Sequence, residues 1–163
     1  MTDARFADAD ERALRLRVLD AEDLEVFSAL LQDAAGRAGD LVWMRARRRF
    51  ALFLNRFRWE DAPRAEGAGR PFERVRCVVL VHYVLSVRAS GVDPRDAEQA
   101  VSVLRLAFEP SAEPDDPSGL LRVVLSGDGE IALEVECLEL EATDVTRPYE
   151  APSRRAPAHP LDD

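Results

Sequence analysis

Arginine and aromatic side chains are interleaved between residues 45 and 59, and these residue types could bind an anionic group. A guanidinium group donates paired hydrogen bonds to phosphate or carboxylate, and a neighbouring aromatic ring can stack on a base or pack against a partner. We therefore expect a protein or a small anionic ligand to contact this segment. The candidate binding residues are Arg47, Arg48, Arg56, Phe57, Arg58 and Trp59.

Charge is distributed unevenly along the chain. Residues 45–76 contain ten arginines against four acidic residues, whereas residues 109–144 contain one arginine against eleven acidic residues. Acidic strands that lie beside the basic segment would pair with it across a sheet, and each exposed pair would add about 0–1 kcal/mol. We favour this internal pairing. If the two stripes diverge instead, the basic segment is a free binding surface.

The sequence offers few residues for catalysis. The chain has no lysine, which removes Schiff-base and P-loop lysine chemistry. His82 could act as a general acid or base with a glutamate across the sheet, but a half-buried structural histidine is the favoured interpretation. Cys77 and Cys137 lie in apolar runs and are expected in the core. The sequence contains no metal-binding, GxSxG or GxGxxG pattern, so we predict no catalytic residue, metal site or cofactor.

Length and composition indicate one globular domain in a reducing compartment. The chain has 163 residues, of which 47% are hydrophobic and 33% charged, and its two cysteines do not suggest a disulfide framework. No apolar stretch approaches the roughly 18 residues that span a membrane, so we expect a cytoplasmic protein without membrane contact. The net charge of −9 argues against nucleic acid, although weak binding of single strands remains an alternative.

Local patterns predict an antiparallel α+β fold with two helices. Asp20 is the expected N-cap of a helix over 21–34, and Asp93 before Pro94 is the expected N-cap of a second helix over 94–101. The segment 61–71 has the proline, glycine and charge content of a loop. Alternating apolar residues predict strands at 14–19, 41–45, 50–59, 75–87, 103–108, 120–125 and 130–141.

Three features refine the strand pattern. Apolar residues on both faces of 75–87 predict a long, bent, central strand. The sequence Ser-Gly-Asp-Gly at 126–129 predicts a tight hairpin turn. The apolar residues change face near Cys137, which predicts a bulge or a change of sheet there.

The expected domain spans residues 14–145 and is a bent antiparallel sheet or a partly closed barrel, with an outline like that of a pleckstrin-homology domain. Polar residues 1–13 and the proline-rich tail 146–163 are predicted to be disordered. Residues 15–59 and 83–140 share the order strand, helix, strand, hairpin, strand, which suggests an internal β-α-β-β duplication.

Four segments carry a resemblance to a known family. The most specific is RFALFLNRFRWE at residues 49–60, and the others are LRVLDAEDLEVFSALLQD at 16–33, LAFEP at 106–110 and EIALEVECL at 130–138. Over residues 14–145 the chain resembles a small bacterial family of uncharacterised single-domain proteins, classed as a domain of unknown function. The resemblance implies no known activity, cofactor or catalytic residue. Our working hypothesis is therefore a non-enzymatic binding or regulatory module that uses the hairpin 45–59.

Overall fold

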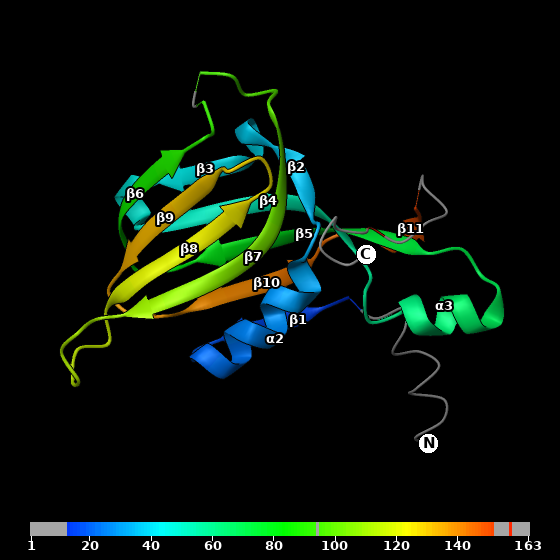
Figure 1. Cartoon of the computed structure of the whole chain (residues 1–163), viewed down its shortest axis with the longest axis horizontal. Helices are drawn as coiled ribbons and strands as arrows, with labels where there is room; N and C mark the ends of the chain where they lie inside the picture. The colour runs from blue at the N-terminus through cyan, green and yellow to red at the C-terminus, as the bar shows by residue number, and fades with distance from the viewer. Residues whose placement is uncertain (1–12, 94, 152–156, 158–163) are drawn as a thin grey trace.

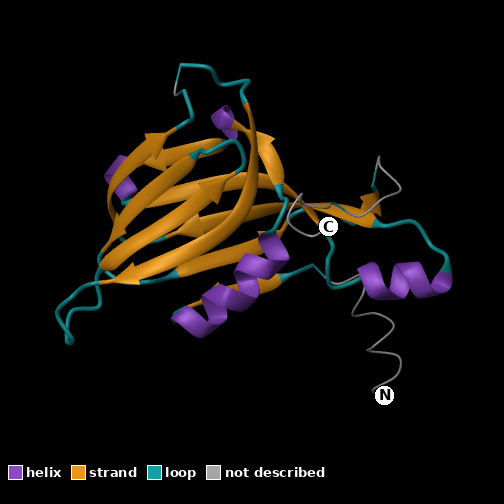
Figure 2. Cartoon of the chain, viewed as in Figure 1, coloured by secondary structure: helices purple, strands orange, loops and turns teal. Residues whose placement is uncertain are grey.

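The structure is a computed structural model that describes residues 13–93, 95–151 and 157. These residues form one bent antiparallel sheet with two α-helices, which confirms the predicted antiparallel α+β architecture (Figures 1 and 2). Hydrogen-bonded strands follow the order β1-β10-β5-β4-β2-β7-β8-β9-β6, while β3 pairs with β4 and β11 pairs with β5. The order begins at β1 and ends at β6, so the sheet bends strongly but does not close.

The first half of the chain supplies both helices. Its elements are β1 (Arg15–Val18), α2 (Ala21–Leu31), β2 (Ala35–Arg37), the 3-10 turn η1 (Ala38–Asp40), β3 (Leu41–Met44), the 3-10 turn η2 (Arg45–Arg47), β4 (Arg49–Phe57), α3 (Ala62–Ala68) and β5 (Glu73–Val81). The second half contains strands: β6 (Val84–Ser90), β7 (Ala100–Pro110), β8 (Gly119–Leu125), β9 (Glu130–Val135), β10 (Leu140–Asp144) and β11 (Tyr149–Glu150).

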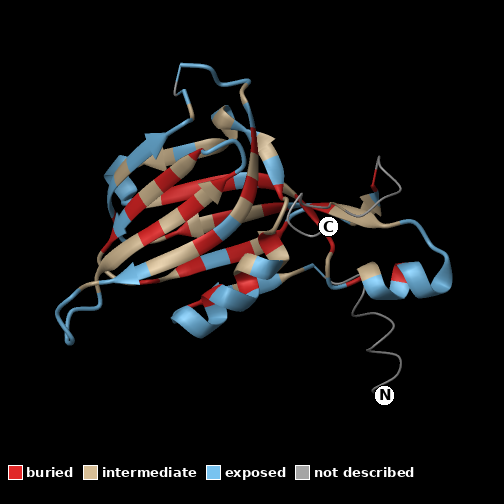
Figure 3. Ribbon diagram, in the orientation of Figure 1, coloured by how far each residue is buried: buried red, intermediate tan, exposed pale blue. Residues whose placement is uncertain are grey.

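The first helix forms as predicted. The Asp20 side chain accepts a hydrogen bond from the backbone nitrogen of Asp23 at 2.8 Å, which caps the amino end of α2. Leu24, Phe27 and Leu31 recur at helical spacing and are buried. They attach α2 to β7, β1 and β4 and help to fill the core that the bent sheet encloses (Figure 3).

The second helix lies elsewhere than predicted. Residues 62–68 form α3 rather than a loop, with proline in the first turn and Gly69 at a φ of 67° after the last. The helix predicted over 94–101 is wrong for residues 95–101; residue 94 lies outside the described residues. Ala100 and Val101 instead pair with Arg37 and Gly36 as the start of β7, because burial of Val101 and strand pairing outweigh the local capping signal.

The long central strand bends at one point. β5 lies between β4 and β10, and its continuation β6 pairs with β9. The bend falls at His82 and Tyr83, and Tyr83 adopts a left-handed conformation with a φ of 56°. The strand predicted over 75–87 is therefore two strands: β5 is central and the chain bends after it, as predicted, whereas β6 lies at the edge of the sheet.

Two further predictions about the last strands are confirmed. Gly127 and Asp128 have φ values of 73° and 65° in the turn between β8 and β9. After residue 135 the chain leaves the pairing of β9 with β8 and β6, and β10 pairs with β5 and β1. The change of neighbours occurs around Cys137, where the apolar residues change face.

The sheet continues past the predicted domain boundary at residue 145. Tyr149 and Glu150 form β11 and pair with Arg74 and Glu73, so this part of the predicted tail is ordered by backbone hydrogen bonds. Residues 1–12, 152–156 and 158–163 of the two segments predicted to be disordered lie outside the described residues. Within the described ranges, no helix is long and apolar enough to cross a membrane.

Candidate functional site

The predicted binding residues lie at the two ends of β4, and only one end is exposed. Arg47 and Arg48 belong to the turn before β4, where both are exposed. The Arg48 guanidinium contacts the Glu136 carboxylate at 2.7 Å. Arg56 lies at the other end of β4, about 26 Å away at 3.3 Å per residue. The six predicted residues therefore do not form one surface.

Arg56 is buried, with 1% of its surface exposed. Its Nε and Nη2 atoms donate to the two carboxylate oxygens of Asp144 at 3.0 and 2.8 Å, and its Nη1 atom donates to both oxygens of Glu60 at 2.9 Å. Burial acts to lower the pKa of this guanidinium, but the hydrogen bonds to Asp144 and Glu60 raise it above its ordinary value. Arg56 therefore has a structural role.

The next three predicted residues are also held inside the protein. Phe57 and Arg58 are buried, and Arg58 Nη1 donates to Glu73 Oε1 at 2.7 Å. The rings of Phe57 and Trp59 meet edge to face with centroids 4.6 Å apart. Trp59 Nε1 donates to the carbonyl oxygen of Gln32 at 2.8 Å. Phe57 and Trp59 thus pack within the fold instead of presenting a stacking surface.

The basic and acidic stripes meet across the sheet at two points in the described part of the chain. Arg48 pairs with Glu136, and Arg56 pairs with Asp144. These contacts join the arginine-rich segment to the acidic end of the chain, as the favoured interpretation predicted. Part of the charge polarity along the chain is therefore internal structure.

His82 pairs with a glutamate across the sheet, as the enzyme alternative requires. Its Nε2 atom lies 3.2 Å from Oε1 of Glu141, and its side chain is 14% exposed. Its backbone nitrogen donates to the carbonyl oxygen of Glu139. His82 does not line the hollow described below, so the pair is separated from the main concave surface.

The surroundings of both cysteines disfavour the reactive thiolate, although Arg56 acts to lower the pKa of Cys77. Burial raises the pKa of the Cys77 thiol to about 12, and burial together with nearby Glu139 and Glu136 raises the pKa of Cys137. Within the described ranges, no three histidine, cysteine, aspartate or glutamate residues are placed to hold a metal ion.

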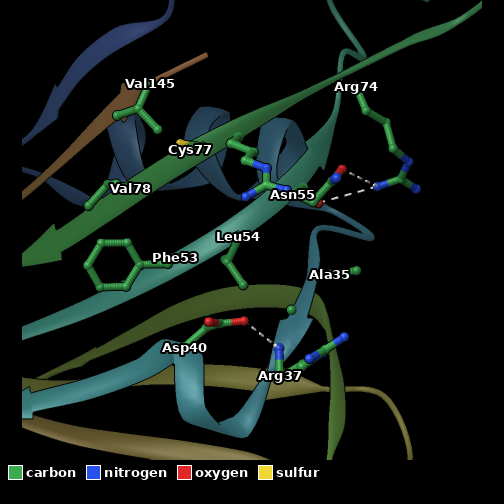
Figure 4. A pocket seen from close by; sticks show the side chains of 12 residues that line it. Ala35, Arg37, Asp40, Phe53, Leu54, Asn55, Arg74, Cys77, Val78 and Val145 are labelled. Carbon is green, nitrogen blue, oxygen red and sulfur yellow. Dashed lines mark hydrogen bonds between the residues drawn. The ribbon is translucent and has the colours of Figure 1, made fainter. Parts of the chain in front are cut away.

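The sheet bears a hollow of about 780 Å³ beside β2, β4 and β5, which we call the arginine hollow (Figure 4). Its volume falls within the roughly 300–1,000 Å³ of small-ligand sites. It is lined by Ala35, Gly36, Arg37, Asp40, Phe53, Leu54, Asn55, Arg74, Arg76, Cys77, Val78 and Val145. Three guanidinium groups and one carboxylate give this surface a positive charge within a protein whose net charge is −9.

Strand register places these residues together. Asn55 of β4 pairs with Ala35 of β2 on one side and with Arg76 of β5 on the other. Phe53 pairs with Val78 in the same way. Because neighbouring residues on a strand face opposite sides, Phe53 and Asn55 point away from the core that Leu52 and Leu54 enter.

A glycine allows β2 to approach β4 at the wall of the hollow. A Cβ atom on Gly36 would lie 3.1 Å from Cδ2 of Leu54 and 3.2 Å from the carbonyl oxygen of Phe53. After Arg37 the chain turns away through η1, and the Asp40 carboxylate accepts a hydrogen bond from the Arg37 backbone nitrogen at 3.0 Å. The strands therefore diverge where the hollow forms.

The three arginines of the hollow are held differently. Arg74 Nη1 donates to the backbone and side-chain oxygens of Asn55 at 3.3 Å each, and Asn55 Nδ2 donates to the Tyr149 hydroxyl. Arg37 Nη1 contacts Glu98 at 2.6 Å, but both side chains are more than 60% exposed, so this pair is weak. Arg76 is exposed, and its guanidinium has no hydrogen-bond or ion-pair partner in the described part of the chain.

Apolar surface lies beside these charges. Phe53 is 46% exposed, and Val145 is 56% exposed. A half-exposed aromatic ring in the same hollow as guanidinium groups is a composition typical of protein interfaces. The hollow can therefore hold an anionic group and an apolar group side by side.

The sequence interpretation missed this site, although one signal was present. Arg74 and Arg76 alternate with Val75 and Cys77, which places the two arginines on the face opposite the core. The predicted binding residues include Phe57 and Trp59, which are adjacent to Arg56 and Arg58 in the sequence, but not Phe53. The contribution of Arg37 from β2 depends on strand order, which local patterns do not contain.

Two neighbouring carboxyl groups, on buried Asp61 and on partly exposed Glu73, lie at the amino end of α3. Burial and a hydrogen bond shared with Asp61 raise the pKa of Glu73, whereas hydrogen bonds from Arg70 lower the pKa of Asp61. Arg70 Nη2 and Nη1 donate to the two Asp61 oxygens at 2.8 and 3.0 Å. The two carboxyl groups should therefore contribute to stability with opposite dependence on pH.

A Glu73→Gln variant should gain stability relative to the unmodified protein as pH rises from 4 to 7. A raised folded-state pKa means that Glu73 favours folding when protonated, and this contribution is lost as pH rises through the folded pKa. Glutamine keeps a neutral side chain at every pH. Urea unfolding across this range measures the difference. A difference that stays constant or falls would show that the ion pair with Arg58 determines the behaviour of Glu73 instead.

Asp61→Asn is the matched variant with the opposite sign. Its loss of stability should be largest at neutral pH, because a lowered pKa stabilises the fold above the unfolded value and this contribution disappears as pH falls through the folded pKa.

Comparison with known proteins gives one family match. A family model described as Protein of unknown function (DUF2948) matches residues 14–159, a range that includes all the helices and strands of the described fold. No curated protein and no solved structure matches the chain.

Proposed function

The chain belongs to this family of proteins of unknown function, and we propose that it is a non-enzymatic binding or regulatory protein that holds an anionic ligand in the arginine hollow. The single observation that carries the proposal is the exposed Arg76 guanidinium, which has no partner among the described residues and lines the same hollow as the half-exposed ring of Phe53. An arginine in such a place keeps its donors available for phosphate or carboxylate.

The chemistry of the lining supports binding rather than proton transfer. Arginine stays protonated throughout the physiological range, and an asparagine amide does not titrate. The polar groups of Arg74, Arg76 and Asn55 can therefore orient and neutralise an anion but do not exchange protons with it. A pleckstrin-homology-like outline and a cytoplasmic location remain parts of this proposal.

An enzyme that uses His82 is the second candidate. The contact of 3.2 Å between His82 and Glu141 favours it, because such a pair can serve as a general acid and base. The pair lies outside the arginine hollow. A His82→Gln variant should therefore bind anions as well as the unmodified protein does.

Replacing Arg76 with alanine should weaken citrate binding about tenfold or more, because one charge-assisted hydrogen bond contributes roughly 1.5–3 kcal/mol. Isothermal titration with citrate and with inorganic phosphate at low ionic strength measures the dissociation constants, since salt screens exposed charges. Arg88→Ala is the matched control, because Arg88 is an exposed arginine on β6 outside the hollow.

Two results would contradict the proposal. One is the absence of saturable binding of either anion by the unmodified protein. The other is equal affinity of the Arg76→Ala and Arg88→Ala variants, which would place any binding outside the hollow.

A further inference from the structure

We infer that the ligand of the arginine hollow is an extended acidic segment of a partner protein, with a large apolar side chain that packs on Phe53. This inference rests on the proposed function and adds the chemical class of the partner. It follows from how the arginines are spread, from the apolar floor between them and from the charge of the whole protein.

The guanidinium groups are spread across the hollow and do not converge on one point. Figure 4 shows Arg74 and Arg37 on opposite sides of Asn55 and Ala35. Ala35, Asn55 and Arg76 lie side by side on three paired strands, which spans about 10 Å at the usual strand spacing. Asn55 holds Arg74 at one wall, and Arg37, whose pair with Glu98 is exposed, extends from β2 at the other.

A ligand that uses both walls must therefore carry more than one negative charge at separated positions. A single phosphate or carboxylate would engage one wall only. In an extended peptide, alternate side chains face the same way and lie about 7 Å apart. Acidic residues at such spacing can reach Arg76 and Arg37 from one backbone.

The floor between the charged walls is apolar. Phe53 is 46% exposed and pairs with Val78 across the strands, and the 56% exposed Val145 lies on the β10 side of Val78. Covering such a ring removes apolar surface from water, at about 25 cal/mol per Å². A ligand made only of charged groups would leave this surface exposed. An apolar side chain between acidic ones covers it.

The net charge of the protein favours an acidic protein segment over a nucleic acid as the ligand. With a net charge of −9, the protein repels nucleic acid over distances where salt does not screen the charge. The positive surface is local, with three arginines and Asp40 in the hollow. A few carboxylates match that surface, whereas each further nucleotide of a nucleic acid adds a phosphate for which the hollow has no arginine.

The test compares labelled probes by fluorescence anisotropy. The first is the peptide Glu-Glu-Leu-Glu-Glu-Leu-Glu-Glu, the second has serine in place of both leucines, and the third is a short oligothymidylate. The unmodified protein should bind the leucine peptide about tenfold more tightly than the serine peptide and more tightly than the oligonucleotide. Replacing Phe53 with alanine should abolish the preference for leucine.

Leu85→Ala is the matched control, because Leu85 is 43% exposed on β6, outside the hollow, and its loss should leave the preference for leucine intact. Thermal unfolding of both variants confirms that each is folded. Equal affinity for the two peptides, or tighter binding of the oligonucleotide, overturns the inference while citrate binding that depends on Arg76 still upholds the proposed function. Loss of that dependence on Arg76 overturns the proposed function itself.

Discussion

Replacing Arg56 with alanine should lower the free energy of unfolding by about 3–5 kcal/mol, because it leaves a buried carboxylate without its partner. The Asp144 side chain is 1% exposed and receives two hydrogen bonds from Arg56. Burying a charge without a partner costs much more than losing an exposed ion pair. Urea unfolding of the purified variant measures the change.

Arg47→Ala provides the comparison for this prediction. Arg47 is an exposed arginine in the turn before β4, so its loss should change stability by about 0.5 kcal/mol or less. Equal stabilities for the two variants would mean that Asp144 is hydrated or neutralised without Arg56. A larger loss of stability for Arg56→Ala than for Arg47→Ala would show that arginines close together in the sequence have different structural roles.

Replacing Phe57 with alanine should also cost about 3–5 kcal/mol, whereas the same change at Phe53 should cost about 1 kcal/mol or less. Phe57 is 1% exposed, and its ring lies 4.6 Å from that of Trp59 and 5.6 Å from that of Phe72, measured between centroids. Truncation there would leave a cavity that the sheet cannot easily close. Phe53 is 46% exposed and loses little packing.

Thermal and urea unfolding of the two phenylalanine variants check this pair of predictions. Peptide binding should be affected although little stability is lost. The Phe53→Ala variant should remain folded and lose the apolar contact with the leucine peptide. A large loss of stability for Phe53→Ala would mean that its ring belongs to the core, and the arginine hollow would then lack its apolar floor.

The arginines of the basic segment differ in what they contact. Arg56 and Arg58 neutralise buried acidic groups at the end of β4, and Arg48 pairs with Glu136 at its start. Arg74 and Arg76, on the neighbouring strand, face the hollow. The arginine-rich segment therefore contains buried arginines with a structural role and exposed arginines that can contact a ligand. The degree of burial distinguishes the two groups.

Short-range patterns predicted those parts of the fold whose causes are local. Asp20 capping identified α2 because the cap and the amide that it satisfies are three residues apart. The turn at Gly127 and Asp128 was predictable because positive φ values are a property of residue type. The same reasoning failed at 94–101, where the partner strand β2 decides the conformation of Ala100 and Val101.

The candidate site likewise combines features that are local in the sequence with features that depend on strand pairing. The spacing of Arg74 and Arg76 along one strand is visible in the residues themselves, since alternation with Val75 and Cys77 assigns them to the outer face. The burial of Arg56 against a carboxylate depends on pairing between segments far apart in the chain. The same is true of the strand order that brings Arg37 and Asn55 to the hollow with Arg76. Residue types and their spacing act over a few residues, whereas strand order and burial arise from contacts across the whole domain. For that reason the chain alone predicted an arginine-rich binding protein, and only the folded sheet showed which arginines are buried in ion pairs and which line the hollow.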